Sequence, residues 1–379
     1  MCYHFNIKST RETAGMGRTP SSFQKIDKSL SHSDISHMLS LRDPLANRRL
    51  LDAAYWAKSR TLGRTVFLRG LIEISNVCRR NCFYCGIRRD NASVKRYQLT
   101  QDQILDAARL AHASGFGSIV LQGGERKDAA FVDFIARTLT RIRQETDRQL
   151  GITLSLGEQS ADTYGTWFRH GADRYLLRLE TTNPDLFRNF HPDDQVYADR
   201  LECLAHLRRI GYQVGTGVMI GLPGQTPDDL ADDILFFKEH DIDMVGMGPF
   251  IPHPDTVHAP LIAGFDRRRQ LQLSLRMIAL TRLVLPDVNI AATTALQALD
   301  PEGRELGLKA GANVVMPNLT DAAHRGDYLL YPGKPQLDEA SPAGQADLRE
   351  TIGMLGEQIG FGLRGDPLHF SRRLRSGRA

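Results

Sequence analysis

The stretch "LRGLIEISNVCRRNCFYCGIRRD", residues 68–90, joins an apolar run to a loop that carries three cysteines. The apolar run, 68–75, is short and rich in Leu and Ile, which is typical of a buried β-strand. Cys78, Cys82 and Cys85 follow it in a C-x3-C-x2-C spacing, and the chain has only two other cysteines. The stretch therefore predicts a strand whose carboxyl end leads directly into a cluster of thiols.

Seven more short apolar runs follow, and each ends in a Gly, Pro or polar cluster before a helical pattern begins. They cover residues 118–124, 151–158, 174–180, 213–222, 243–250, 288–295 and 312–318. Near-continuous apolar strands that alternate with helices predict a parallel sheet covered by helices. Eight such units predict an α/β fold of the (β/α)8 TIM-barrel type, in which reacting groups lie at the carboxyl ends of the strands.

The composition is that of an ordinary globular protein, because 41% of the 379 residues are hydrophobic and can form a large core. The net charge is +4, from 48 basic and 44 acidic residues, which gives no electrostatic footprint for nucleic acid or an anionic membrane. We find no apolar run long enough for a membrane span and no secretory signal near the N-terminus. The cysteines are clustered rather than spread as in a disulfide framework. We therefore expect a cytoplasmic protein.

The chain divides into four expected parts. They are a flexible N-terminal segment (1–32), a helical prelude (33–62), the barrel (63–334), and a C-terminal helical segment with a basic tail (335–379). In the prelude, Ser33 or Asp34 is expected to cap the first helix, and residues 43–62 continue as helix. The last residues, "SRRLRSGRA" (371–379), predict a solvated, frayed end of the chain.

Three clustered thiols are one too few for a structural zinc site, which takes four ligands. Of the other two cysteines, Cys203 lies in a helical pattern beside "LAHLRRI" and is expected in the core, whereas Cys2 is expected to be incidental. Iron–sulfur clusters are held by cysteine thiolates, and three ligands on a four-iron cluster leave one iron open. An open iron is free to bind a reactant.

The cysteine spacing, with the aromatic Tyr84 directly before the last thiol, resembles the radical S-adenosylmethionine (SAM) superfamily. "QGGE" (122–125) and "GVMIGLPG" (217–224), which end later strands, are similar to glycine motifs of that superfamily. The resemblance implies that the three cysteines bind a 4Fe-4S cluster whose open iron is chelated by SAM. It further implies that one electron cleaves SAM to methionine and a 5′-deoxyadenosyl radical. No side chain is singled out as catalytic, because the cofactors carry the chemistry.

Several stretches resemble one family closely, the FeFe-hydrogenase maturase HydE family of radical SAM proteins. They include residues 73–91, 171–180, 243–256, 289–295 and 331–334, which follow in one order along the barrel. The resemblance implies a radical SAM enzyme of hydrogenase active-site assembly, whose substrate is a small iron complex that carries cysteine, CO and cyanide. Its implied partners are the other hydrogenase maturation proteins and a ferredoxin or flavodoxin reductant, with no nucleic acid and no membrane.

Matching the family position by position implies two sets of site residues. Those implied around SAM are Tyr84, Gln122, Gly123, Gly124, Ser155, Glu158, Glu180 and Arg200. Those implied to line the substrate cavity are Arg178, Met244, Thr293, Thr294 and Tyr331. A carboxylate such as Glu180 accepts hydrogen bonds from amino or ribose groups, and a guanidinium such as Arg200 binds a carboxylate through two donors. The two threonines are expected to end a strand, so the two-residue period turns at least one hydroxyl inward.

Simpler roles stay open for several positions. Glu180 pairs with Arg178 on the same strand face in one alternative, and Arg200 is a solvated helix residue in another. Met244 is equally well explained as an ordinary core residue. His253, which lies between two prolines after the sixth strand, fits a structural role in its loop as well as it fits catalysis.

Two other functions also stay open. One is a radical SAM amino-acid mutase of the methylornithine-synthase type, and the other is a non-catalytic scaffold that carries the cluster. Residues 332–379 contain no cysteine, which argues against the second cluster that some family members carry there. It also argues against biotin synthase, whose sulfur-donating cluster needs further cysteines.

Overall fold

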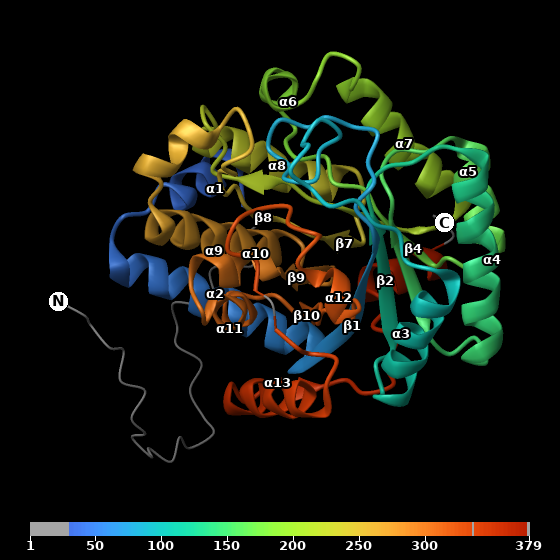
Figure 1. Cartoon of the computed structure of the whole chain (residues 1–379). Helices are drawn as coiled ribbons and strands as arrows, with labels where there is room; N and C mark the ends of the chain where they lie inside the picture. Colours follow the sequence, from blue (N-terminus) through green and yellow to red (C-terminus); the bar gives the residue numbers. More distant parts are fainter. Residues whose placement is uncertain (1–29, 336, 377–379) are drawn as a thin grey trace. The chain divides into compact units, whose positions relative to one another are not determined.

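The computed structural model describes residues 30–335 and 337–376, so the expectations for residues 1–29, Cys2 included, lie outside the described part. Eight parallel strands form a barrel in which the last strand pairs with the first (Figure 1). They are β1 (Thr65–Ser75), β2 (Ser118–Gly123), β3 (Gly151–Ser155), β4 (Arg174–Leu176), β5 (Gln213–Thr216), β7 (Met244–Val245), β9 (Asn289–Ala292) and β10 (Val314–Val315). Seven of the expected apolar runs each contain one of these strands, and the first run, 68–75, lies within β1, which begins at Thr65. The (β/α)8 prediction is therefore confirmed.

The barrel closes through β1, which is long enough to pair with three strands. Its first two residues pair with β11 (Gln358–Ile359), Phe67 and Leu68 pair with β10, and residues 69–75 pair with β2. Beyond the carboxyl ends of β5 and β7, the chain forms a second small sheet, in which β6 (Met219–Ile220) pairs with β8 (Gly248–Pro249). This small sheet extends the wall of the barrel on the side of its mouth.

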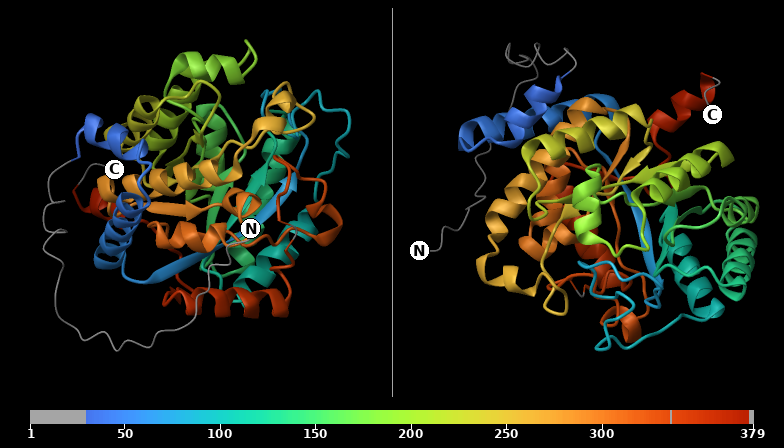
Figure 2. Two further views of the ribbon diagram at one scale, coloured as in Figure 1. Left: turned by 90° about the vertical axis from the view of Figure 1, so that its left-hand side faces the viewer. Right: turned by 90° about the horizontal axis from the view of Figure 1, so that it is seen from above.

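Helices cover the outside of the strands, as the two views in Figure 2 show. They are α3 (Gln101–Ala113), α4 (Ala129–Glu145), α5 (Ala161–Arg169), α6 (Pro184–Phe190), α7 (Tyr197–Ile210), α8 (Pro227–Glu239), α9 (Arg267–Val284), α10 (Thr294–Leu299), α11 (Gly303–Lys309) and α12 (Ala322–Arg325), with a short 3-10 helix, η2 (Ala259–Gly264). Cys203 is buried in α7, as expected of a core residue. None of the described helices is both long and apolar enough to cross a bilayer.

Two helices precede the barrel. α1 (His32–Leu39) packs against α8, and α2 (Pro44–Leu62) packs against α9. α1 is capped by Ser31, so the expected cap at Ser33 or Asp34 is wrong. The physical reason is a capping box, in which the Ser31 hydroxyl accepts from Asp34 N while the Asp34 carboxylate accepts from Ser31 N at 3.0 Å. Asp34 therefore serves as the third residue of the helix.

The segment after the barrel closes the end of the barrel opposite the cysteines. α13 (Pro342–Met354) leads into β11, and residues 364–366 then contact the first residues of three strands. Arg174, Gln213 and Asn289, which begin β4, β5 and β9, donate hydrogen bonds of 2.7 to 2.8 Å to this segment. The mouth at the carboxyl ends of the strands is therefore the end where a ligand can enter.

The basic tail is mostly exposed to solvent over the residues that the structure describes, as expected, but it is helical through Arg375, so the expectation that it is frayed is wrong there. α14 (Leu368–Arg375) docks on carboxylates that precede two of the strands. Arg372 Nη1 lies 2.7 Å from Asp287 Oδ2, and Arg373 Nη2 lies 3.0 Å from Asp243 Oδ2. The sequence hides these contacts because the partners are 85 and 130 residues apart in the chain.

Candidate active site

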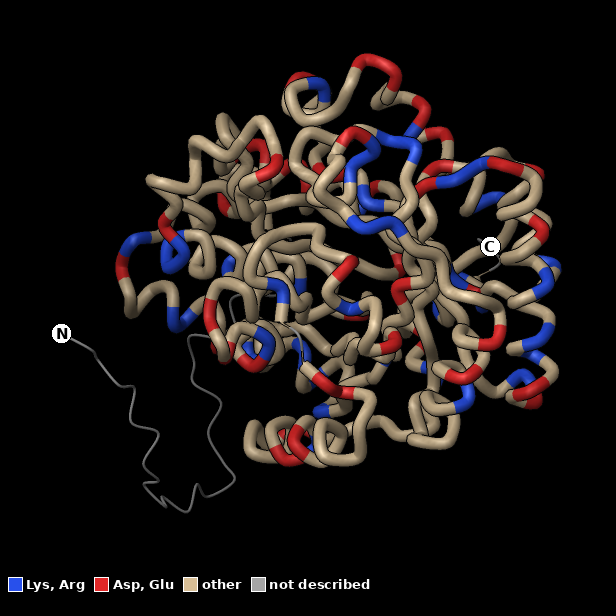
Figure 3. Tube along the Cα trace, viewed as in Figure 1, with Lys and Arg blue, Asp and Glu red and all other residues tan. Residues whose placement is uncertain are grey.

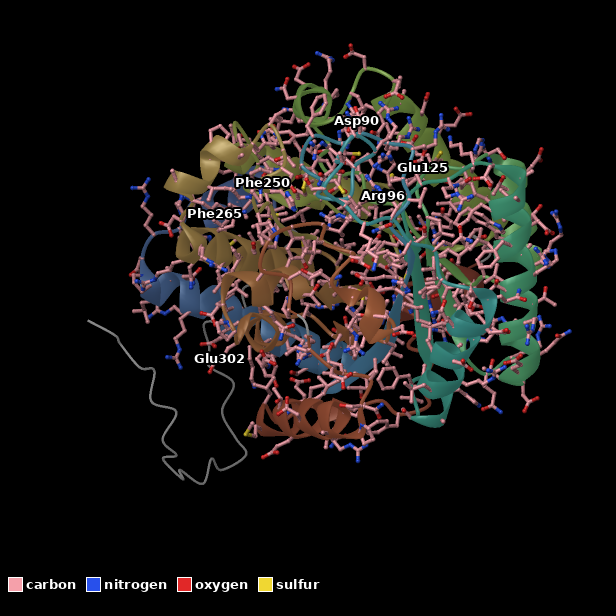
Figure 4. All side chains as sticks on the ribbon, in the orientation of Figure 1. Asp90, Arg96, Glu125, Phe250, Phe265 and Glu302 are labelled. Atoms are coloured by element: carbon pink, nitrogen blue, oxygen red, sulfur yellow. The ribbon has the colours of Figure 1, made fainter. Side chains whose placement is uncertain are left out.

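The cysteine loop follows β1 at the mouth of the barrel, in the region that Asp90, Arg96 and Glu125 mark in Figure 4. All three of its cysteines are free thiols, and all three are half-buried. They lie at the carboxyl end of a barrel strand, which is where folds of this type carry their chemistry.

The environment of the sulfurs fits an iron–sulfur cluster. Cys78 Sγ accepts hydrogen bonds from two backbone amides, Arg80 N at 3.4 Å and Glu125 N at 3.3 Å. Hydrogen bonds to ligand sulfurs are one of the means by which proteins tune such clusters. Within the described residues, no three His, Cys, Asp or Glu side chains converge as ligands of one metal ion would. The thiolates of a four-iron cluster stand further apart, because each one binds a different iron.

Burial keeps these thiols protonated at neutral pH. It raises the pKa of Cys82 to about 12 and also raises the pKa of Cys85, and the neighbouring cysteine sulfurs add to both shifts. Iron binds the thiolate, so cluster uptake must release these protons. A free cysteine nucleophile needs a lowered pKa, so the raised pKa values of Cys82 and Cys85 give no support to a nucleophilic role.

The turn after β2 packs directly on the cysteine loop. A Cβ atom at Gly124 would lie 2.4 Å from the carbonyl oxygen of Val77 and 2.8 Å from Cβ of Cys78. Only glycine fits so close an approach. Two residues earlier, Gln122 Nε2 donates to Tyr328 OH at 3.3 Å. The "QGGE" motif therefore joins the cysteine loop to the segment that follows β10.

Two carboxylates and two guanidiniums form a row of buried ion pairs beside the cysteine loop. Arg80 Nε lies 2.7 Å from Glu125 Oε1, and Arg80 Nη2 lies 2.5 Å from Glu158 Oε2. Glu158 Oε1 lies 2.6 Å from Arg200 Nε. Burial acts to raise the pKa of Glu158, but the two guanidiniums outweigh it and hold that pKa below its usual value. The alternating signs allow four charged groups to be buried together.

Two of these four buried charged residues, Glu158 and Arg200, were expected at the SAM site from the sequence. Arg200 is buried, so the alternative of a solvated helix residue is wrong. Arg80 and Glu125 were missed, although Arg80 lies between two of the cysteines and Glu125 ends the "QGGE" motif. Their places in motifs were a usable signal. Their contact with each other, across 45 residues of chain, left no trace in the sequence.

Glu180 follows β4 in a strained conformation. It is buried and its φ is +73°, which is in the left-handed region. The other described non-glycine residues with positive φ, which are Asp147, Arg148 and Asp241, lie in turns between elements. Strain at a buried position is a feature of functional sites. Glu180 Oε2 lies 3.0 Å from Arg178 Nη2, so the pairing considered as its simpler role is present in the structure.

Tyr84 is held by contacts that the sequence did not reveal. Its ring packs against an apolar cluster of Phe190, Met219, Leu222 and Phe250. Its hydroxyl lies 3.3 Å from His191 Nε2, and His191 Nδ1 lies 2.8 Å from the carbonyl oxygen of Phe187. The carbonyl requires a proton on Nδ1, so Nε2 accepts a hydrogen bond from Tyr84. Burial lowers the pKa of His191 to about 3, which keeps it a neutral acceptor.

Hydroxyl groups expected at the substrate cavity meet at the mouth of the barrel. Thr294 Oγ1 lies 2.8 Å from Tyr331 OH, and Thr293 Oγ1 donates to Met247 O at 3.3 Å. The strand itself ends at Ala292, so the expectation that the threonines end β9 is wrong. They follow the strand because Thr293 already has the extended conformation of a helix cap, at the start of α10.

Met244 lies deeper in the barrel than these hydroxyls. It is in register with Asn289, four residues before Thr293, which corresponds to about 13 Å at the usual rise of a strand. Its Sδ accepts from Arg69 Nη1 at 2.9 Å, and both side chains line an internal cavity of about 30 Å³. The structure therefore does not bring Met244 and Tyr331 together.

Residues 72–237 match the family model of the radical SAM superfamily. This match, together with the three free thiols after the first strand of a (β/α)8 barrel, shows that the protein is a radical SAM enzyme. It is 47% identical over 327 residues to the [FeFe] hydrogenase maturase subunit HydE of Thermotoga maritima, a match that covers 86% of this chain and 91% of that protein. The chain belongs to the FeFe-hydrogenase maturase HydE family.

More distant relatives share the barrel. The 3-methylornithine synthase of Methanosarcina barkeri is 29% identical over 291 residues, which is 76% of this chain and 79% of that protein. The solved structure of methylornithine synthase (PylB) has a TM-score of 0.75 and 24% identity over 90% of this chain and 98% of that chain, which shows the fold alone. Membership of the radical SAM superfamily implies a 4Fe-4S cluster and SAM as cofactors.

Proposed function

We propose that this enzyme holds a 4Fe-4S cluster on Cys78, Cys82 and Cys85 and uses SAM to act on a small iron complex that carries cysteine, CO and cyanide. The product is a precursor of the two-iron part of the FeFe-hydrogenase active site. When bound, the cluster and SAM supply one-electron chemistry that generates a carbon radical. One observation carries the proposal: three free thiols lie at the mouth of a closed barrel, in a chain 47% identical to a HydE maturase.

The SAM-binding surface consists, in this proposal, of Tyr84, Gln122, Gly123, Gly124, Ser155, Glu158, Glu180 and Arg200. Gly123 and Ser155 support it as the last residues of β2 and β3, at the mouth of the barrel. Besides burial, the charges of Arg200 and Glu180 act on the pKa of Cys82, so both groups are near a cluster ligand. A guanidinium and a carboxylate at such a place suit the carboxylate and amino groups of SAM.

Arg200 is fixed before any ligand arrives. Its Nε binds Glu158, and its Nη1 donates to the carbonyl oxygen of Arg178 at 2.5 Å. Both contacts hold the plane of the guanidinium, so less side-chain entropy is lost when a carboxylate binds to it. Glu158 thereby orients Arg200 on one side and Arg80 on the other.

The substrate lies inside the barrel, lined by Arg178, Met244, Thr293, Thr294 and Tyr331. Hydroxyl and guanidinium donors suit a small complex whose cyanide and thiolate groups accept hydrogen bonds. The closed barrel excludes water and keeps the reacting groups next to each other. Because Met244 lies deep beside Arg69, it contacts only a part of the substrate that reaches the inner cavity.

The partners we propose are the other hydrogenase maturation proteins, which exchange the iron complex, and a ferredoxin or flavodoxin, which supplies the electron. We place this chemistry in the cytoplasm, where thiols stay reduced. The near-balanced charge of the chain, +4 overall, supports small-molecule and protein partners over nucleic acid or a membrane surface.

The test uses the full chain, reconstituted with iron and sulfide without oxygen and reduced with dithionite. Two products are measured, which are 5′-deoxyadenosine from SAM and hydrogenase activity when apo-hydrogenase extract is added. We expect both in the wild type and neither in Cys82→Ala. Cys203→Ala is the matched control, because Cys203 is buried in α7, outside the cysteine loop, and donates to Gln159 O at 3.6 Å. It should retain both activities.

Two other results would replace the proposal. Formation of methylornithine from lysine, without activation of the hydrogenase, would identify an amino-acid mutase instead. Cluster uptake with no cleavage of SAM would leave only a scaffold that carries the cluster.

A further inference from the structure

One arginine side chain binds backbone carbonyl groups at both ends of the cysteine loop. Arg96, labelled in Figure 4, donates its side-chain hydrogen bonds to backbone carbonyl groups of that loop. Nη1 reaches Asn76 O at 2.7 Å and Ile87 O at 2.8 Å, and Nη2 reaches Arg88 O at 2.6 Å, Arg89 O at 3.2 Å and Asn91 O at 3.2 Å. These acceptors lie on both sides of the three cysteines in sequence, so one guanidinium joins the two ends of the loop.

The backbone that carries Arg96 is itself tied to the end of β1. Asn76 Nδ2 donates to Lys95 O at 2.8 Å, and Tyr97 N donates to Asn76 Oδ1 at 2.8 Å. Tyr97 OH donates to Glu73 O at 2.8 Å. The guanidinium is therefore presented from a fixed strap, residues 95–97, and it can hold the loop in one conformation.

The charge of Arg96 is not neutralised by any carboxylate that the structure describes. Arg80 and Arg89 on the same loop do have carboxylate partners, and Figure 3 shows the basic positions gathered along this loop. A half-buried guanidinium that binds only carbonyl groups keeps its full charge, and its field is only partly screened by solvent. Arg96 Nη1 binds Asn76 O and Ile87 O, which lie two residues before Cys78 and two residues after Cys85, so the charge of Arg96 lies beside both ends of the cysteine segment.

We propose that Arg96 is a positioning residue that holds the cysteine loop in its ligating conformation before the cluster binds, and whose charge raises the reduction potential of the bound cluster. The inference rests on the proposed 4Fe-4S cluster. A nearby positive charge favours the reduced cluster, because reduction adds negative charge. Arginine suits the role because its planar group carries five N–H donors in a fixed arrangement, which lysine cannot match.

Two substitutions separate the two parts of this role. Arg96→Lys keeps the charge but loses the fixed set of donors, whereas Arg96→Gln loses both. Arg126→Gln is the matched control, since Arg126 lies at the same mouth and binds the side chains of Asp128 and Gln98. Each full chain is reconstituted with iron and sulfide, and no SAM or substrate is added. The readouts are the rate at which a chelator removes iron and the midpoint potential of the cluster, followed by electron paramagnetic resonance (EPR).

We expect iron to be lost roughly tenfold faster from both Arg96 variants, and the midpoint potential to become more negative only in Arg96→Gln. The control should match the wild type in both readouts. Retention of iron by Arg96→Gln at the wild-type rate would overturn the positioning role. An unchanged midpoint potential in Arg96→Gln would overturn the electrostatic role.

A wild-type chain that takes up no cluster would refute the proposed function and would leave the positioning role to be tested on iron-free protein. Limited trypsin digestion then reports on the loop. We expect faster cleavage after Arg79, Arg88 and Arg89 in both Arg96 variants, and equal cleavage in variants and wild type would overturn the positioning role. Cleavage throughout the chain would mark an unfolded variant, in which case the milder Arg96→Lys carries the test.

Discussion

The backbone N–H of Gly86 donates to the carbonyl oxygen of Leu330 at 3.0 Å, which ties the residue after the last loop cysteine to the residue before Tyr331. A Cβ atom at Gly86 would lie 2.1 Å from Leu329 O and 2.5 Å from His253 Nε2. Three segments of the mouth therefore meet at one glycine, and the His253 side chain lies at that junction. This contact fixes the distance between the loop that carries the thiols and the segment that carries Tyr331. A reaction between two bound ligands requires such a fixed distance.

Gly86→Ala should uncouple the cleavage of SAM from the activation of the hydrogenase. The added methyl group displaces residues 329–331 and Tyr331 with them, while the cysteine spacing is unchanged. We expect SAM cleavage to continue and hydrogenase activation to fall by roughly 100-fold, because a shift of about 1 Å in a reacting group has effects of that size. The measurement is the ratio of 5′-deoxyadenosine formed to hydrogenase activated. Gly264→Ala is the control, since its Cβ would meet nothing within 4 Å. An unchanged ratio in Gly86→Ala would contradict the coupling.

Glu158→Gln should destabilise the fold as well as the site. The substitution leaves the guanidiniums of Arg80 and Arg200 buried with one carboxylate fewer, and breaking a buried ion pair in this way costs about 3–5 kcal/mol. Urea unfolding of the iron-free chain measures the loss in the free energy of unfolding. Asp133→Asn is the matched control, because its 2.9 Å pair with Arg137 is exposed and such pairs contribute at most about 1 kcal/mol. Equal losses in the two variants would argue against a stabilising network.

Tyr84 and His191 should act as one unit in SAM binding. Tyr84→Phe and His191→Phe each remove the same 3.3 Å hydrogen bond. A bond of this kind contributes about 1 kcal/mol, so each variant should bind SAM roughly fivefold more weakly. The double variant should lose no more than His191→Phe alone, because that single variant has already lost the hydrogen bond between Tyr84 and His191. Equilibrium binding of SAM to the reconstituted proteins tests this, and losses that add would refute the coupling.

His369 should make the stability of the fold depend on pH. Its hydrogen bond to Asp287 at 3.3 Å, followed by one to Asp241 at 2.6 Å, raises its pKa to about 9. A histidine whose pKa is higher in the folded state stabilises fully below its unfolded value, about 6.5, and loses that contribution as the pH rises toward 9. We expect a loss of roughly 1–2 kcal/mol across this range, after allowing for solvent screening.

Urea unfolding of wild type and His369→Gln at the two ends of this pH range checks that expectation. The variant should lose the pH dependence that α14 contributes. His206→Gln serves as control, because the partner of His206, Glu202, lies 3.5 Å away and is exposed. A pH dependence that is the same in His369→Gln and wild type would show that the α14 contacts do not titrate in this range.

The barrel and the thiol cluster were predictable because both are local patterns. Each strand is a short apolar run before a helical pattern, and the spacing of the cysteines is contained in one loop. Strand ends were less certain, as Thr293 and Thr294 show. A residue that can extend a strand can equally cap the helix that follows, and the apolar pattern does not distinguish the two.

The partners of the site residues were not predictable, because they are distant in sequence. Arg80 meets Glu158 across 78 residues, and Tyr84 meets His191 across 107. A side chain's local pattern does not record which distant carboxylate or imidazole folds next to it. Arg96 was missed for a different reason, since its acceptors are backbone carbonyl groups, which every residue type supplies.

The most direct test of the central claim is the EPR spectrum of the reduced, reconstituted protein before and after SAM is added. We predict about four irons per chain, as in a single 4Fe-4S cluster, and a spectrum that changes when SAM binds to the open iron. A chain that takes up no iron and sulfide, or a cluster whose spectrum stays the same in the presence of SAM, would contradict the account.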